Sequence, residues 1–175
     1  VEVVMPTEEA CCGALQQQLG REDEAHKAAR RNVDAWSSAL REGPLDAILT
    51  TASGCGTMIK DYGHLLARDR GYAERATDMS RIARDIGEFI YELGLLPPLA
   101  WTSLRVAYHS ACSLEHGQQV GHEPRALLSQ AGFTVLEVPE GHICCGSAGT
   151  YNMLQPELSG QLRDRKLKNI ASVKP

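Results

Sequence analysis

A repeated Cys-Cys-Gly motif constrains the fold of this chain more than any other feature. Val4-Met5-Pro6 precedes Cys11-Cys12-Gly13, and Val138-Pro139 precedes Cys144-Cys145-Gly146. In both copies the first cysteine follows the proline by five positions (11 − 6 and 144 − 139), and the copies lie 133 residues apart (144 − 11). Each copy has the pattern of a short apolar strand, a proline, a loop and a helix. The repeat therefore predicts two related halves.

Apolar periodicity predicts strands that alternate with helices. The segments with the pattern of strands are Glu2–Met5, Asp46–Thr50, Leu104–Tyr108 and Phe133–Val138. Apolar residues recur every three or four positions in 22–41, 72–93 and 154–170, which predicts a helix over each range. This alternation indicates an α/β fold in which short strands pair mainly in parallel.

The helix expected over 72–93 and the Pro97-Pro98 pair that follows it separate the two halves. We expect a domain boundary near residue 98, with one domain over 1–98 and a second over 99–175. The alternative is that these prolines only end a helix within a single domain, because prolines are common in loops.

Composition excludes several classes of protein. The 175 residues include 18 Lys and Arg against 22 Asp and Glu, a net charge of −4, and 43% are hydrophobic. This apolar content excludes a disordered chain, and no apolar run reaches the roughly 18 residues of a membrane span. The mildly acidic balance without a basic stripe gives no support for nucleic-acid binding. The chain begins at Val1 without a recognisable signal peptide, so we expect a piece of a longer protein.

Every cysteine follows a predicted strand. The six are Cys11, Cys12, Cys55, Cys112, Cys144 and Cys145. Because the carboxyl ends of parallel strands meet at one edge of a sheet, we expect four segments to bring their thiols to that edge. Adjacent cysteines rarely bond to each other, so bound metal or redox chemistry is favoured over a disulfide framework. Inert buried thiols in tight turns are the alternative.

Glycines and histidines near the cysteines are further candidates. The glycines are Gly13, Gly54, Gly56 and Gly146, and the histidines are His64, His109 and His116, with His142 close to Cys144. Glycine permits positive φ and lets the backbone approach a ligand closely. Each histidine is a candidate for a ligand, a hydrogen-bond donor or a structural cap. Thiolate donors without short Cys-x2-4-Cys pairs favour an iron–sulfur cluster over structural zinc.

Longer motifs carry a resemblance to a known family. They are Cys11-Cys12-Gly13, Ser53-Gly54-Cys55-Gly56 with Tyr62-Gly63-His64-Leu65-Leu66, Tyr108 to Gln118, and Cys144 to Asn152. These phrases resemble the cysteine-rich (CCG) domains of the heterodisulfide reductase B-subunit superfamily, and within it the glycolate-oxidising branch. The resemblance covers essentially the whole chain. It implies the later part of one module in 1–98 and the earlier part of a second in 99–175.

The resemblance also implies a function. It implies a non-catalytic electron-transfer subunit of a glycolate (2-hydroxy acid) oxidoreductase, with the six cysteines as ligands of a 4Fe-4S type cluster. Electrons would come from FAD on a partner subunit and pass to a membrane acceptor such as quinone. The protein would be cytoplasmic, or peripheral at the inner membrane through its partners.

Met58 departs from the family pattern, because it stands where the Cys-x-x-Cys motif has its last cysteine. A thioether is a weak ligand compared with a thiolate. A different cluster, a histidine substitute or no cluster in the first module therefore stays open. Two other functions also stay open: a zinc-binding or non-redox scaffold that docks partner subunits, and thiol–disulfide chemistry at the cysteine pairs.

Overall fold

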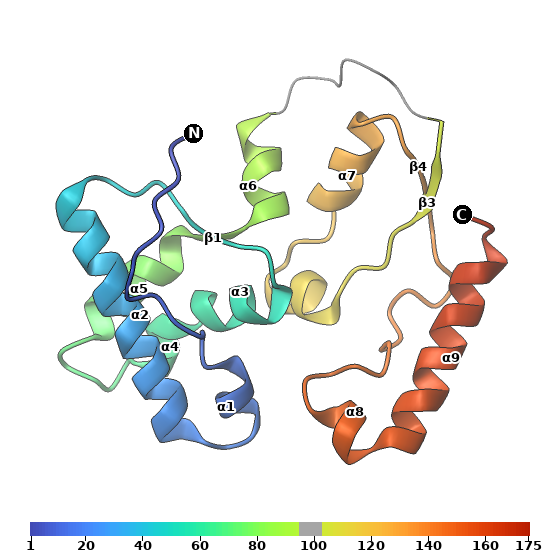
Figure 1. Ribbon diagram of the computed structural model, residues 1–175. Coiled ribbons are helices and arrows are strands. Elements are labelled where there is room, and N and C mark those ends of the chain that lie inside the picture. Colours follow the sequence, from blue (N-terminus) through green and yellow to red (C-terminus); the bar gives the residue numbers. More distant parts are fainter. Residues whose placement is uncertain (95–102) are drawn as a thin grey trace. The chain divides into compact units, whose positions relative to one another are not determined.

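The computed structural model of the chain describes residues 1–94 and 103–175 (Figure 1). These residues form two units, Val1–Ile86 and Gly87–Pro175. The domain boundary expected near residue 98 lies outside the described residues. Among the described residues, no helix is both long and apolar enough to cross a membrane.

The first unit places five helices around two parallel strands. Its elements are α1 (Ala14–Gln18), α2 (Glu22–Glu42), β1 (Ile48–Thr50), α3 (Ser53–Lys60), α4 (Tyr62–Leu65), α5 (Ala73–Ile82) and β2 (Ala83–Asp85). Strand β1 pairs with β2 in register, with Leu49 opposite Arg84.

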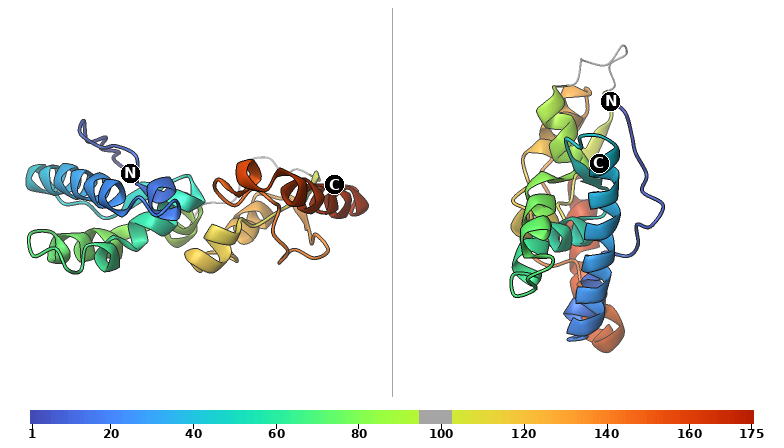
Figure 2. Two further views of the ribbon diagram at one scale, coloured as in Figure 1. Left: turned by 90° about the horizontal axis from the view of Figure 1, so that it is seen from below. Right: turned by 90° about the vertical axis from the view of Figure 1, so that its left-hand side faces the viewer.

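Helix α2 provides one wall of the core of this unit. Three acidic residues lie in its first turn, Glu22 to Glu24, where the positive end of the helix dipole stabilises their negative charge. Ala29 and Val33 on its apolar stripe are fully buried, whereas Leu40 at the end of the stripe is exposed. Trp36 stacks on Tyr62 with ring centroids 5.9 Å apart. Helices α2 and α5 run alongside each other (Figure 2). The stripe predicted over 22–41 is therefore a core-facing helix.

The second unit has a smaller core. Its elements are α6 (Ile86–Leu93), β3 (Arg105–Ala107), the π-helix η1 (Ser113–Gly117), α7 (Glu123–Gln130), β4 (Thr134–Leu136), α8 (Tyr151–Leu154) and α9 (Pro156–Ser172). Strands β3 and β4 are parallel, with Val106 opposite Val135. Its described buried apolar residues are Leu114, Val120 and Val138.

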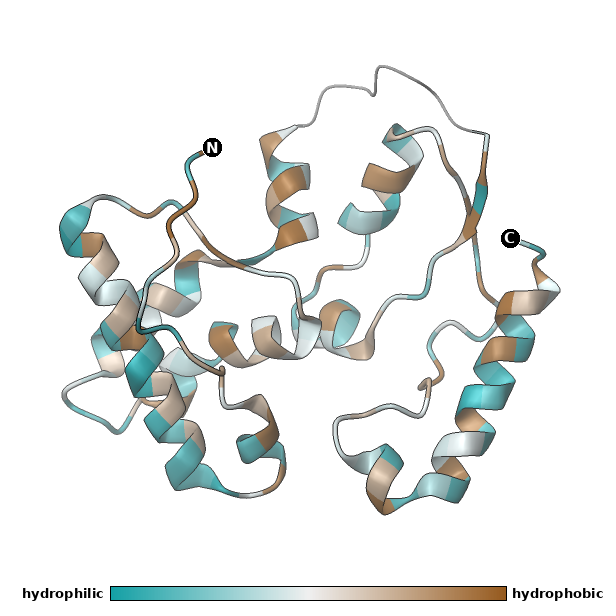
Figure 3. Ribbon diagram, viewed as in Figure 1, coloured by the Kyte–Doolittle hydropathy of each residue, from teal (hydrophilic) through white to brown (hydrophobic). Residues whose placement is uncertain are grey.

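Three of the four predicted strands are confirmed in shorter form as β1, β3 and β4, whereas Glu2–Met5 is not a strand. The segment before α1 is rich in hydrophobic residues (Figure 3), but Val3 is 74% exposed and Met5 is 85% exposed. An apolar pattern alone does not make a strand, because the backbone also needs a neighbour that completes its hydrogen bonds. No described strand pairs with this segment.

The single helix expected over 72–93 is also wrong. Strand β2 divides it into α5 and α6. Ala83 and Asp85 are buried where they pair with β1, and the helical spacing of apolar residues runs on through the break. A three-residue strand is too short to interrupt that periodicity, so the sequence pattern missed it.

Candidate metal centres

Neighbouring helices fix the Cys11-Cys12-Gly13 turn of the first unit. Gly13 has φ +85°, and a Cβ there would lie 3.1 Å from the Ala25 carbonyl oxygen on α2. Only glycine combines this left-handed backbone with such a close approach. Helix α1 begins at the next residue, as expected for a loop that leads into a helix.

Two buried polar side chains hold the same turn. Asn32 of α2 is 1% exposed; its Oδ1 accepts the Ala10 N–H at 2.8 Å, and its Nδ2 donates to the Tyr62 hydroxyl at 3.0 Å. That hydroxyl in turn donates to the Cys12 carbonyl oxygen at 2.8 Å. Nδ2 also reaches the Cys11 carbonyl oxygen at 3.4 Å. This network satisfies buried backbone groups beside the cysteines and fixes their position.

The thiols of the first unit come from two segments. Cys12 is buried, Cys11 is exposed, and Cys55 lies in the first turn of α3, five residues after β1 ends (55 − 50). The pKa of Cys12 is raised to about 12: burial has the largest effect, the backbone N–H of Ala14 lowers the pKa, and the neighbouring thiols of Cys55 and Cys11 raise it. Cys12 and Cys55 are thus close enough to interact.

The second unit repeats this arrangement with other elements. Cys112 directly precedes η1, five residues after β3 ends (112 − 107), and Cys144 and Cys145 lie in the loop that follows β4. Because β3 and β4 are adjacent and parallel, both segments leave the same edge of the sheet. The backbone N–H of Gly146 donates to Cys144 Sγ at 3.3 Å.

Residues of helix α9 contact the loop on both sides of Cys144-Cys145. Gly146 has φ +89°, and a Cβ there would clash with the Ser159 carbonyl oxygen. Ser159 Oγ donates to the Gly146 carbonyl oxygen at 2.8 Å. Two turns further along, Lys166 Nζ donates to the carbonyl oxygens of Glu140 and Gly141 at 3.0 and 3.1 Å. Asn169 adds a bond to the Pro139 carbonyl oxygen at 3.0 Å.

Sequence reasoning missed these holding residues. Asn32, Tyr62, Ser159 and Lys166 are all less than a tenth exposed, and none is a cysteine, glycine or histidine near the motif. The spacing that Asn32 and Lys166 share becomes visible only once the structure shows which residues contact Gly13 and Gly146. Asn32 follows the Gly13 contact Ala25 by seven residues (32 − 25), and Lys166 follows the Gly146 contact Ser159 by seven (166 − 159).

The charged surroundings of the second centre act on two candidate residues. Burial lowers the pKa of the half-buried His109 imidazole, and the charge of Lys166 lowers it further. Burial raises the pKa of Cys112, and so do the thiols of Cys144 and Cys145. His109 and Cys112 therefore lie in one electrostatic neighbourhood with the Cys144-Cys145 pair.

The positions of the other histidine and glycine candidates, and of Met58, do not by themselves indicate a role at a cluster. His64 on α4 and His116 on η1 are exposed, and so is His142. Gly54 and Gly56 lie within α3, and neither has the positive φ expected for glycines that flank these cysteines. Met58 is 8% exposed and belongs to the apolar core with Cys12 and Tyr62, so it acts as a packing residue there.

Each unit therefore carries three thiols on two neighbouring segments, without a carboxylate among the groups that act on them. A donor set of thiolates alone fits an iron–sulfur cluster. Among residues 1–94 and 103–175, no three His, Cys, Asp or Glu side chains are already grouped closely enough to hold a metal ion. The donor chemistry fits, and a cluster would have to draw the thiols together. That all four segments share one edge stays a prediction.

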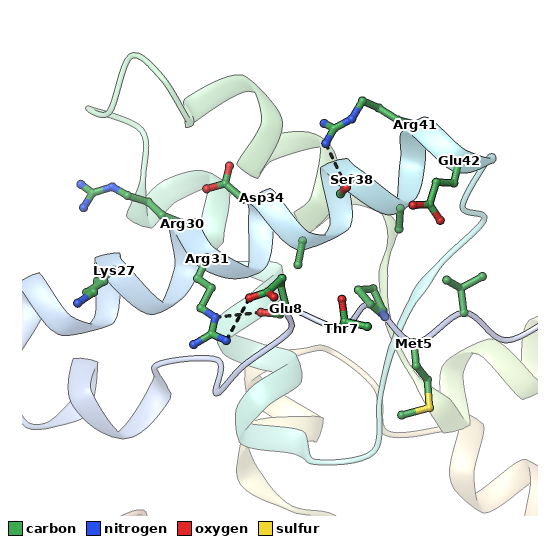
Figure 4. A pocket seen from close by; sticks show the side chains of 14 residues that line it. Met5, Thr7, Glu8, Lys27, Arg30, Arg31, Asp34, Ser38, Arg41 and Glu42 are labelled. Carbon is green, nitrogen blue, oxygen red and sulfur yellow. Dashed lines mark hydrogen bonds and ion pairs between the residues drawn. The ribbon is translucent and has the colours of Figure 1, made fainter.

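Two cavities lie near these elements. A cavity of about 650 Å³ runs between the N-terminal segment and α2 and is lined by charged residues such as Arg31 and Glu8, which pair with each other (Figure 4). None of the predicted site residues lines it. A polar cavity of about 270 Å³ in the second unit is lined by His109, Ser110 and His142.

Comparison with known proteins gives a family and several relatives. The cysteine-rich domain (CCG) family matches residues 1–60 and 106–175, one match in each half. The glycolate oxidase iron-sulfur subunit of Escherichia coli (strain K12) is 42% identical over 173 residues, which are 98% of this chain and 42% of that protein. The probable glycolate oxidase iron-sulfur subunit of Bacillus subtilis (strain 168) is 33% identical over 97% of this chain and 38% of its own length.

A third relative is covered more fully. Lactate utilization protein A of Bacillus subtilis (strain 168) is 27% identical over 97% of this chain and 69% of that protein. By contrast, the chain spans about two fifths of the length of the two glycolate oxidase subunits.

Proposed function

This chain belongs to the cysteine-rich (CCG) domain family, and from that premise we propose that it is an iron–sulfur electron-transfer part of an oxidoreductase that acts on glycolate. One relative is named glycolate oxidase iron-sulfur subunit and another probable glycolate oxidase iron-sulfur subunit, and these names supply the substrate and the cofactor of the proposal. The six cysteines are the proposed ligands, with a cluster of 4Fe-4S type.

The observation that carries this proposal is the thiol-only donor set of each unit. Cys112 and the Cys144-Cys145 pair follow adjacent parallel strands, and Cys12 interacts with Cys55. Soft thiolates select iron–sulfur clusters, zinc or copper(I) over harder ions. Because these donor sets consist of thiols and not of carboxylates, they favour an electron carrier over a hydrolytic metal site.

The residues around the thiols would prepare them for a cluster. An iron–sulfur cluster bound there would accept one electron and pass it on. Gly13 and Gly146 let the backbone turn tightly beside the ligands, and the Gly146 N–H stabilises negative charge on Cys144 Sγ. The buried Asn32 and Tyr62 keep the first turn in place. Hydrogen bonds to sulfur and burial are two of the factors that set a cluster's reduction potential.

We further propose the partners. Electrons would come from a subunit that carries FAD, where a 2-hydroxy acid is oxidised, and would leave to a membrane acceptor such as quinone. The chain would act on the cytoplasmic side, or at the inner membrane through those partners. The histidines His64, His109 and His116, together with Gly54 and Gly56, stay candidates for residues that line the cluster.

The test is metal analysis of the full-length protein purified without oxygen. We expect iron and acid-labile sulfide in similar amounts, visible absorbance and an electron paramagnetic resonance signal after reduction. C144S should lose iron relative to wild type, whereas S147A, at an exposed position two residues beyond Cys145, should keep it. Colourless, iron-free wild-type protein after cluster reconstitution would refute the proposal, and bound zinc would favour the scaffold function.

A further inference from the structure

The two helices that hold the Cys-Cys-Gly turns correspond to each other position by position. On α2, Ala25 meets Gly13, and Asn32 lies two turns further along. On α9, Ser159 meets Gly146, and Lys166 lies two turns further along. Asn32 is 1% exposed and Lys166 is 4% exposed. Each of them forms hydrogen bonds with backbone groups just before its cysteine pair.

The chemistry at this shared position differs between the units. Asn32 is neutral and both accepts and donates hydrogen bonds. Lys166 carries an ammonium group, which only donates. Lysine is almost never fully buried unless a partner compensates its charge, so its presence at this position requires an explanation.

Among the described residues, the partners of the Lys166 ammonium group are carbonyl oxygens and not a carboxylate. Its Nζ binds two carbonyl oxygens, and the nearby Glu140 carboxylate is instead bound by Arg165 and Asn169. Within the described part of the chain, no carboxylate forms a salt bridge with Lys166. Its charge acts on Cys112 and His109, because it lowers the pKa of both groups, although burial has the larger effect on each.

We propose that Lys166 is a positioning residue that fixes a buried positive charge at residues 140–141, in the approach to the Cys144-Cys145 pair, and thereby raises the reduction potential of the cluster that Cys112, Cys144 and Cys145 hold. This inference rests on the proposed function. It assigns the first unit a centre without such a charge, because Asn32 occupies the equivalent place. The two centres then differ in potential although their ligands are alike.

The physical reason is charge balance. Three thiolates around a cluster concentrate negative charge, and a one-electron reduction adds one more negative charge. A cation within the same low-dielectric surroundings stabilises the reduced form more than the oxidised form. Net charge and hydrogen bonding are established determinants of cluster potentials. The two carbonyl contacts keep the ammonium group in place, and they also hold residues 140–141 in the approach to Cys144.

The test compares three variants of the full-length protein, purified without oxygen. K166Q removes the charge and keeps an amide donor, and K166R keeps the charge. K168Q removes the same charge from an exposed position on α9 and is the matched control. The measurements are iron per chain, the midpoint potential of each centre from a redox titration followed by electron paramagnetic resonance, and hydrogen–deuterium exchange over 139–146.

We expect K166Q to shift one midpoint potential to a more negative value, K166R to keep it near that of wild type, and K168Q to leave it unchanged. A K166Q protein that retains iron and an unchanged potential would overturn the inference. If K166Q loses iron, retention of iron by K166R supports the charge, and loss of iron from both variants overturns it. Wild-type protein without iron would instead refute the proposed function itself.

Discussion

At the scale of single residues, two of the cysteines, Cys12 and Cys112, lie in surroundings that resist ionisation of the thiol. Burial and neighbouring thiols raise the pKa of Cys12 to about 12 and raise that of Cys112. Metal ligation requires the thiolate, so cluster binding must release protons from these groups. Loading should therefore weaken as the pH falls.

A raised thiol pKa also predicts how the protein without its cluster responds to alkali. Between pH 9.0, where an ordinary thiol titrates, and about pH 12, folded Cys12 keeps a proton that the unfolded chain has lost. The stabilising contribution is complete below pH 9 and is lost as the pH rises through this range. Urea unfolding of the reduced, iron-free protein should give a free energy of unfolding that falls as the pH rises above 9. The free energy of unfolding of C12S should fall less steeply over the same range. Equal slopes would contradict the raised pKa of Cys12. The pKa of Tyr62 is raised mainly by burial, which both proteins share, whereas the smaller effect of the Cys12 thiol on Tyr62 is present only in wild type and adds to the expected difference.

Gly146 offers a sharper test, because both its backbone and its surroundings exclude a side chain. G146A should lower the free energy of unfolding by more than about 2 kcal/mol, through strain at positive φ and a clash with the Ser159 carbonyl oxygen. G20A is the matched control, since Gly20 has φ +72° but nothing within 4 Å of a Cβ, and should cost about 1 kcal/mol. Denaturant melts and iron content measure both effects, and similar losses in the two variants would argue against the clash.

At the scale of elements, the first Cys-Cys-Gly turn depends on α2 and α4 as well as on its own glycine. The Tyr62 ring packs on Trp36 while its hydroxyl bridges Asn32 and Cys12. One short helix thus joins the apolar core to the backbone of a ligand.

Y62F tests this link. The substitution leaves the ring in place but removes the acceptor for Asn32 and the donor for the Cys12 carbonyl oxygen. We expect a loss of about 1–3 kcal/mol in unfolding free energy, because buried polar groups are left without partners. Y72F should change stability by no more than about 0.5 kcal/mol, since the bond from Tyr72 to Asp34 is exposed. Chemical denaturation measures both, and a neutral Y62F would mean that water replaces the hydroxyl.

Elements could be predicted from the sequence where a pattern was long or was repeated. The 21-residue helix α2 shows an uninterrupted apolar stripe, and strands β1, β3 and β4 lie inside apolar segments bounded by turn residues. Strand β2 could not be found, because pairing with β1 and not local pattern makes it a strand. The repeated Cys-Cys-Gly motif indicates the site in the sequence. The residues that hold the motif lie on distant helices, so no pattern near the cysteines predicts them.

At the scale of the whole molecule, the two units differ in how much apolar surface they bury. The first contains a continuous cluster that joins Val33, Trp36, Tyr62 and Met79, whereas the described part of the second buries few apolar side chains and several polar ones, among them Ser159 and Lys166. Burial of apolar area is the main source of stability, so the second unit relies more on its hydrogen bonds and on a bound cluster.

This difference predicts uneven protection. In hydrogen–deuterium exchange of the full-length protein without its cluster, amides of α2 and α5 should exchange more slowly than those of α7 and β4, because they lie on the larger core. Reconstitution of the cluster should slow exchange in the second unit by the larger factor. Equal protection of the two units in both states would show that the core sizes do not govern local stability.

The residues of α9 that hold the loop around the second cysteine pair lie far from that loop in the sequence. Ser159, Lys166 and Asn169 contact the loop over 139–146 from positions 13 to 30 residues downstream of their partners (159 − 146 and 169 − 139). A substitution that prevents cluster binding therefore need not replace a cysteine. A damaged variant of this protein should therefore be examined first along the inward side of that helix, where a conservative-looking exchange can release the ligands from a distance.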